Sequence, residues 1–448
     1  MKDILELLPV RRIQAYRQFL VPKAYRILEF LTSQGIALAA RLTYGFLCVR
    51  LLPVTEYAKF AVVFGFLGFL SVLMDFFSGT LLPLVGERIN DRQLIADYVA
   101  SLRQLAHRVY LLAAPAAIVV YPLVVRKQQW SWRVIAAMVL LLLVASWFGR
   151  MGGTYGSALI ALRNRRAWYQ AQLISGVGSL AALGVVWAVH ALNAFSAILI
   201  SVAAIAFLSL HYCFRARETL GVRGHPSVEK RRAIIHLALP VAPNVIFYAL
   251  QGQLSLFLIT FFGHSAAVAS VGALSRLAQI FMLFGQMAPL LIEPYFAKLP
   301  QSRVKRNYLG MLAAQGTLCI CATSLARYFP QIFLWILGPK YGALRQEVVL
   351  MIAGSSIAYL SAVLFMIHTA RRFVYWWNSV LVIIFTVTAQ ALFIIKTDLS
   401  TVRGVLVLNL VTAAVGLFVH VFTGIYGLVR GPRSHATGEL VSVEDSYV

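Results

Sequence analysis

The chain has 448 residues, of which 60% are hydrophobic and only 12% are charged, and its mean hydropathy is +0.78. Soluble globular proteins carry about 25% charged residues, so this composition excludes a soluble globular domain. The formal net charge of +24 comes without any nucleic-acid-binding motif, and we attribute it to membrane insertion and to contact with anionic lipid.

Apolar blocks of about 20 residues, long enough to cross a bilayer as helices, recur along the whole chain. They predict an all-α polytopic membrane protein with about twelve transmembrane helices. The expected spans are 27–49, 58–82, 109–125, 134–160, 168–189, 194–214, 233–262, 266–296, 308–326, 347–369, 374–395 and 404–428. Residues 1–26 hold six Lys/Arg and show no cleavable signal peptide, so we expect a surface helix there, and 327–346 has the character of another.

The longest hydrophilic interior connection, "RARETLGVRGHPSVEKRR", covers residues 215–232 and lies at the midpoint of the chain. It divides the spans into six and six, which predicts two six-helix bundles, 27–214 and 233–428, around a central cavity. Residues 1–26 and the polar tail 429–448 complete the predicted organisation.

Lysine and arginine are distributed unequally between the two sets of connections. The set that includes both termini carries 27 of them, and the opposite set carries 10. Because positive residues stay on the cytoplasmic side, we expect both termini to be cytoplasmic.

Six spans carry polar residues at helical spacing, so each presents a polar face. Three of these residues are arginines that lie inside apolar blocks: Arg41, Arg150 and Arg276. A charged side chain at bilayer depth costs about 3 kcal/mol on insertion scales, and guanidinium groups bind phosphate oxygens in bidentate fashion. We therefore predict that these arginines bind an anionic substrate, with a diphosphate as the natural group.

Neutral polar residues share these faces and suit the hydroxyl groups of a sugar. They are Asn244, Tyr248, Gln251 and Gln279. Two carboxylates, Asp75 and Glu293, are candidates for coupling transport to an ion. Each of these residues also has a structural interpretation that does not involve a substrate. Arg41 could form an ion pair with Asp75, Arg150 could extend its guanidinium to the membrane surface, and the amide side chains could join neighbouring helices.

Four stretches resemble the polysaccharide and O-antigen lipid-linked oligosaccharide flippases of the multidrug/oligosaccharidyl-lipid/polysaccharide exporter superfamily. They are "RLLPVTEYAKFAVV" (50–63), in which Ala58 stands where the family commonly has glycine, "LMDFFSG" (73–79), "LALPVAPNVIFYAL" (237–250) and "FPQIFLWILGPKYG" (329–342). The similarity extends over residues 27–428.

The resemblance implies two six-helix bundles that work by alternating access in a bacterial inner membrane. It implies a substrate of undecaprenyl diphosphate linked to an oligosaccharide, moved to the outer leaflet for surface polysaccharide assembly, and polysaccharide polymerases or other assembly proteins as partners. By position it implies diphosphate contacts at Arg41 and Arg276. We expect no cofactor, no metal and no enzymatic activity, because the sequence has neither a P-loop nor metal-ligand spacing. The alternatives are a multidrug/cation antiporter of the same superfamily and a membrane glycosyltransferase or polymerase.

Overall fold

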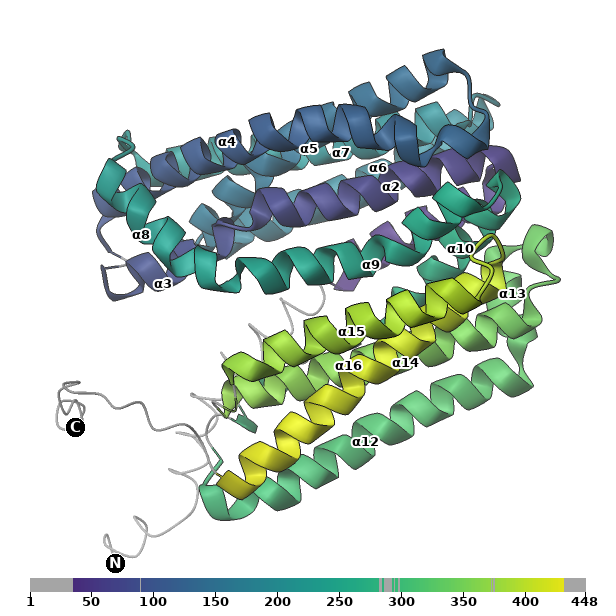
Figure 1. Cartoon of the computed structure of the whole chain (residues 1–448). Coiled ribbons are helices and arrows are strands. Elements are labelled where there is room, and N and C mark those ends of the chain that lie inside the picture. Colours follow the sequence, from purple (N-terminus) through teal and green to yellow (C-terminus); the bar gives the residue numbers. More distant parts are fainter. Residues whose placement is uncertain are drawn as a thin grey trace, which may run out of the picture. The chain divides into compact units, whose positions relative to one another are not determined.

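The computed structural model describes residues 35–430 except 89, 282–283, 286–291, 294, 297–298, 372 and 374. The described residues are almost entirely helical and contain no β-strand (Figure 1). Ten helices within them are long and apolar enough to cross a membrane, which confirms an all-α, multi-pass membrane protein. The predicted surface helix 1–26 and the tail from residue 431 lie outside the described residues.

The ten helices correspond to ten of the twelve expected spans. The first span begins outside the described residues and continues as a helix over 35–51, here α1. The eighth is represented by the shorter apolar helix α10, Ser265–Ala278, which precedes several undescribed residues. Residues 327–346 contain a short helix, α13 (Pro330–Leu337), and its place at the membrane surface stays a prediction.

The contacts divide the chain into two compact units, Met1–Phe261 and Phe262–Val448. Unit 1 contains α1 and the following helices: α2 (Val54–Asp75), α3 (Leu81–Val85), α4 (Arg92–Val124), α5 (Trp132–Ala161), α6 (Arg165–Ala188), α7 (Ala194–Leu220), α8 (Val228–Ala238) and α9 (Ala242–Phe262). In unit 1, α5 packs along α7 and also contacts α2 and α4 (Figure 1).

Unit 2 contains α10, α13 and four long helices: α12 (Gln301–Tyr328), α14 (Arg345–Ala370), α15 (Trp376–Lys396) and α16 (Val402–Arg430). Helix α14 packs along α16 and contacts α12 (Figure 1). The predicted connection 215–232 is partly helical, because α7 continues to Leu220 and α8 begins at Val228. Helix α8 and most of α9 belong to unit 1, where Gln128 Nε2 donates to the Thr260 carbonyl at 2.8 Å. The division of the spans into two bundles of six stays a prediction.

Polar side chains cap the N-termini of several helices of unit 1. The Asp91 carboxylate accepts from the Leu94 amide at 2.9 Å at the start of α4, and the Ser227 hydroxyl accepts from the Lys230 amide at 3.1 Å at the start of α8. Asn193 and Ser196 cap α7 reciprocally. These side chains satisfy amide groups that have no partner in the first turn of a helix.

The second expected span is a broken helix. Helix α2 ends at Asp75, a 3₁₀ turn follows at Ser78–Thr80, and α3 begins at Leu81. Pro83 favours the break, because it has no amide group to donate to the carbonyl four residues earlier, at Gly79. The break leaves Asp75 at the end of a helix within an apolar segment.

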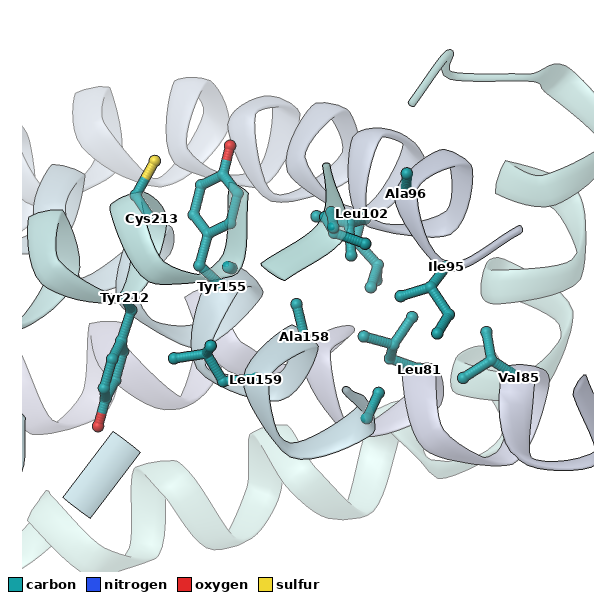
Figure 2. Packing of buried hydrophobic residues seen from close by; sticks show 14 of the residues in the cluster. Leu81, Val85, Ile95, Ala96, Leu102, Tyr155, Ala158, Leu159, Tyr212 and Cys213 are labelled. Atoms are coloured by element: carbon teal, nitrogen blue, oxygen red, sulfur yellow. The ribbon is translucent and has the colours of Figure 1, made fainter. Parts of the chain in front are cut away.

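A buried apolar cluster joins the ends of α3, α4, α5 and α7 in unit 1 (Figure 2). Leu81, Ile95, Leu102, Ala158 and Leu159 are almost fully buried in it. The hydroxyl groups of two tyrosines at its edge, Tyr155 and Tyr212, point to opposite sides (Figure 2). Each hydroxyl group belongs to a different polar region of the unit, since Tyr212 contacts Gln172 and Tyr155 contacts Arg217.

Candidate functional site

The first polar region surrounds Arg41 on α1. Its guanidinium donates to Gln172 Oε1 on α6 and, through Nε, to the Ala37 carbonyl at 3.4 Å. Both acceptors are neutral. The predicted alternative of an ion pair with Asp75 is not formed, and the charge of Arg41 has no carboxylate partner among the described residues.

Gln172 and Tyr212 extend the Arg41 contact toward α7 and α5. Gln172 Nε2 donates to the Tyr212 hydroxyl at 2.9 Å, and the Tyr212 ring stacks on Trp168 with an interplanar angle of 6°. A Cβ at Gly156 of α5 would lie 3.3 Å from the Tyr212 ring. Sequence reasoning missed Gln172 and Tyr212, because their contact joins residues 40 positions apart and the sequence does not show which polar residues of two spans meet.

Arg150 on α5 is held by aromatic rings. Its Cζ lies 4.1 Å from the centroid of Trp147 and 6.0 Å from that of Tyr110 on α4. The residue is only 6% exposed, so it packs inside unit 1 and does not extend to the protein surface. Its guanidinium makes no hydrogen bond or ion pair with any described residue, and Nε is buried without a partner.

Asp75 lies directly over Gly153 of α5, one helical turn from Arg150. A Cβ at Gly153 would lie 1.7 Å from Asp75 Oδ1 and 3.2 Å from the Ser78 hydroxyl. Only glycine leaves room for the carboxylate at this place. Within the described part of the chain, the Asp75 carboxylate forms neither a hydrogen bond nor an ion pair.

Two opposite faces of helix α9 have different surroundings. Gln253 and Leu256 lie against the glycines of α2: a Cβ at Gly68 would lie 3.0 Å from Gln253 Nε2, and one at Gly65 would lie 2.5 Å from Leu256 Cδ2. The predicted binding residues occupy the opposite side of the helix by its periodicity, and one of them, Tyr248, is 46% exposed. They are Asn244, Tyr248 and Gln251.

The remaining candidates belong to unit 2. Arg276 lies in the last turn of α10, and its guanidinium donates to Gln279 Oε1 at 3.4 Å. Glu293 lies in a helical stretch and is half-buried. The described residues contain no group of three or more His, Cys, Asp or Glu suited to hold a metal ion.

The structure therefore brings three of the predicted charged residues, Arg41, Arg150 and Asp75, into one helical unit. The guanidinium of Arg41 contacts α6. The carboxylate of Asp75, from the end of α2, lies over Gly153 of α5, which is three residues from Arg150. Arg276 and Glu293 belong to the other unit. The predicted cavity shared by all of these residues stays a prediction.

No protein-family model matches the chain, and no curated protein sequence matches it. Solved structures of other proteins are similar to this chain. An inward-facing multidrug resistance MATE family transporter of the MOP superfamily is 14% identical, with a TM-score of 0.63 over 88% of this chain and 96% of that one. The lipid II flippase MurJ in an inward closed conformation is 12% identical, with a TM-score of 0.63 over 90% of this chain and 89% of that one.

This chain has the fold of MATE and MurJ transporters. A third similar structure is a MOP superfamily transporter from Pyrococcus furiosus, for which a binding pocket of reversed polarity is described. It is 12% identical, with a TM-score of 0.56 over 89% of this chain and 94% of that one. The similarity covers nearly the full length of each protein.

Proposed function

We propose that the protein is a flippase for an anionic polyprenyl-diphosphate-linked oligosaccharide. It moves this lipid from the cytoplasmic to the outer leaflet of a bacterial inner membrane by alternating access, for surface polysaccharide assembly. Three observations support the proposal: the fold shared with the lipid II flippase MurJ, the four resembling stretches, and the cationic residues inside apolar helices. Polysaccharide polymerases and other assembly proteins are its proposed partners.

One observation carries the proposal. Arg41 and Arg150 are placed in apolar helices, and neither guanidinium has a carboxylate partner among the described residues. A charge in such a segment is costly unless it is paired or meets a charged ligand. A diphosphate supplies the missing counter-charge with an oxygen arrangement that guanidinium groups match.

The other candidate residues take complementary roles. Arg276 is a further diphosphate contact, and Gln279 accepts from it at 3.4 Å. The face of α9 that points away from α2 binds the hydroxyl groups of the sugar. Asn244, Tyr248 and Gln251 lie on this face. Asp75, at the break between α2 and α3, and Glu293 are assigned to ion coupling.

The alternative function, a multidrug cation antiporter, is favoured by the MATE structures alone. An organic cation needs an acidic or apolar binding surface, whereas the charged residues among the predicted site residues of unit 1 are two arginines, Arg41 and Arg150, and one aspartate, Asp75. A membrane glycosyltransferase or polymerase, the second alternative, has no support from the similar structures. The charge balance therefore favours the anionic substrate.

The test is translocation in proteoliposomes. Purified protein is reconstituted with a fluorescent polyprenyl-diphosphate-linked oligosaccharide, and bleaching of one leaflet by dithionite reports lipid movement. We expect Arg41→Gln to lower the rate at least about tenfold, because a charge-assisted hydrogen bond is worth about 1.5–3 kcal/mol. Absence of lipid movement by the native protein, together with uptake of an organic cation such as ethidium, would replace the proposal by the antiporter.

Gly153 provides a test of the Asp75 assignment. We expect Gly153→Ala to displace the carboxylate, because the new Cβ would lie 1.7 Å from Oδ1. We expect both Gly153→Ala and Asp75→Asn to lower translocation several-fold. The protein should still fold, since the end of a short side chain can rotate away. Gly149→Ala, on the same helix with no atom within 4 Å, is the matched control and should be neutral. Translocation at the native rate by both Asp75→Asn and Gly153→Ala would contradict the assignment.

A further inference from the structure

Unit 1 contains a second cationic region, on the side of the apolar cluster opposite Tyr212. A cavity of about 630 Å³ lies between α4, the end of α7 and residues 221–224, with Tyr155 of α5 in its wall. Three arginines line it: Arg103, Arg217 and Arg223. Cavities of this size hold small organic ligands.

The rim of this cavity is fixed in place. Gly221 ends α7 in a left-handed conformation, with φ of 66°, and its amide donates to the Arg217 carbonyl at 3.1 Å. Gly224 lies so close to α4 that a Cβ there would be 1.9 Å from the Ala96 carbonyl oxygen. Asp97 holds the next residues, because its carboxylate accepts from the His225 amide at 2.8 Å and from the Lys230 ammonium. The cavity is therefore preorganised before any ligand arrives.

The cavity carries a positive charge that its one carboxylate does not neutralise. Arg217 is oriented by the Tyr155 hydroxyl, to which it donates at 3.4 Å. The guanidinium groups of Arg103 and Arg223 form no hydrogen bond or ion pair with residues that the structure describes. The single carboxylate in the wall, Glu218, is already paired with Arg215 at 2.9 Å.

Apolar residues complete the wall, namely Ala96, Val99, Ala100, Leu220 and Val222. A free inorganic anion would leave this apolar surface without contact. The combination of three guanidinium groups with an apolar wall suits an anion that carries a larger organic body.

We infer that this cavity binds a phosphate or diphosphate group joined to an apolar or aromatic body, at a site distinct from the transport residues. Neither Arg41, Gln172, Asp75 nor Arg150 lines it, and Figure 2 shows Tyr155 and Tyr212 directed to opposite sides of the cluster. Two sources supply this chemistry: the headgroup of an anionic phospholipid and a soluble nucleotide. Because residues 221–224 begin the linker from α7 to α8, the ligand would contact the connection between the two halves of the sequence.

The experiment uses the full-length protein in phosphatidylcholine nanodiscs. Calorimetric titration with ADP tests the soluble source, and native mass spectrometry after addition of phosphatidylglycerol tests the lipid source. We expect saturable binding of one probe, lowered at least about tenfold by Arg103→Gln. Ala100→Phe, which fills the cavity without changing its charge, should abolish that binding.

Arg108→Gln is the matched control, because Arg108 lies on the same helix, is exposed and does not line the cavity. It should bind the probe like the native protein. Binding of ADP alone identifies a nucleotide site, and binding of phosphatidylglycerol alone identifies a lipid site. Lack of saturable binding of both probes, or an equal loss in Arg103→Gln and Arg108→Gln, would overturn the inference.

Discussion

Replacing Gly424 with alanine is expected to destabilise unit 2 by about 1–3 kcal/mol, the usual cost of overpacking a core. The new Cβ would lie 2.0 Å from the Tyr308 hydroxyl and 2.9 Å from His368 Nε2. Neither side chain has room to move: they are 3% and 1% exposed and share a hydrogen bond of 3.1 Å. Their rings are also stacked, with an interplanar angle of 9°.

Thermal unfolding of the detergent-purified protein measures this effect as a lower melting temperature. Gly416→Ala is the control on the same helix, since its Cβ would meet only the Ser361 hydroxyl at 3.5 Å, an ordinary contact. Adding Tyr308→Phe to Gly424→Ala should recover part of the loss, because it removes the hydroxyl nearest to the new methyl group. A Gly424→Ala protein as stable as Gly416→Ala would show that α16 does not approach α12 and α14 as closely as described.

The sequence predicted the helical fold well, because contiguous apolar length is a local property. Ten expected spans overlap helices of membrane length, although α4 begins at Arg92 and the span was expected from residue 109. Pro115, in the third apolar block, lies inside the continuous helix α4. The break at Ser78–Thr80 was not predicted, although Pro83 marks it in retrospect. A proline in an apolar block allows either a continuous or a broken helix, and the choice depends on neighbours that the sequence does not reveal.

The charged residues were recognised from the sequence, but their partners were not. Arg41 and Asp75 lie in consecutive spans, which made an ion pair the natural alternative. In the structure Arg41 instead reaches Gln172, which is 131 residues away along the chain. Asp75 lies over a glycine, and a glycine in an apolar helix has no sequence signal that identifies it as a place for a carboxylate.

The two cationic regions of unit 1 differ in their surroundings, and this difference supports different roles. Arg41 and Arg150 are flanked by apolar residues of α1 and α5, whereas Arg103, Arg217 and Arg223 line a cavity between the first third of α4, the C-terminal end of α7 and the residues that follow α7. None of the residues that line the cavity is Arg41 or Arg150, so substitutions can be made in either region without removing a side chain of the other.

Arg150→Met is expected to reduce translocation about a hundredfold while leaving the melting temperature unchanged or higher. Arg150 is 6% exposed, its Nε has no partner, and no carboxylate among the described residues balances its charge. Burying an ion costs several kcal/mol, and the contact with Trp147 at 4.1 Å offsets only part of this cost. Removing the charge should therefore not destabilise the fold.

The loss of activity follows from the same burial. Truncating one partner of a buried charge pair costs about 2–5 kcal/mol, so the variant should lose its contact with the diphosphate when the substrate is bound. Arg150→Lys keeps the charge but not the planar geometry, and intermediate activity is expected of it. A structural arginine would give the opposite pattern, in which Arg150→Met lowers the melting temperature and the remaining folded protein moves lipid at the native rate. The two measurements on one variant thus separate a substrate contact from a packing residue.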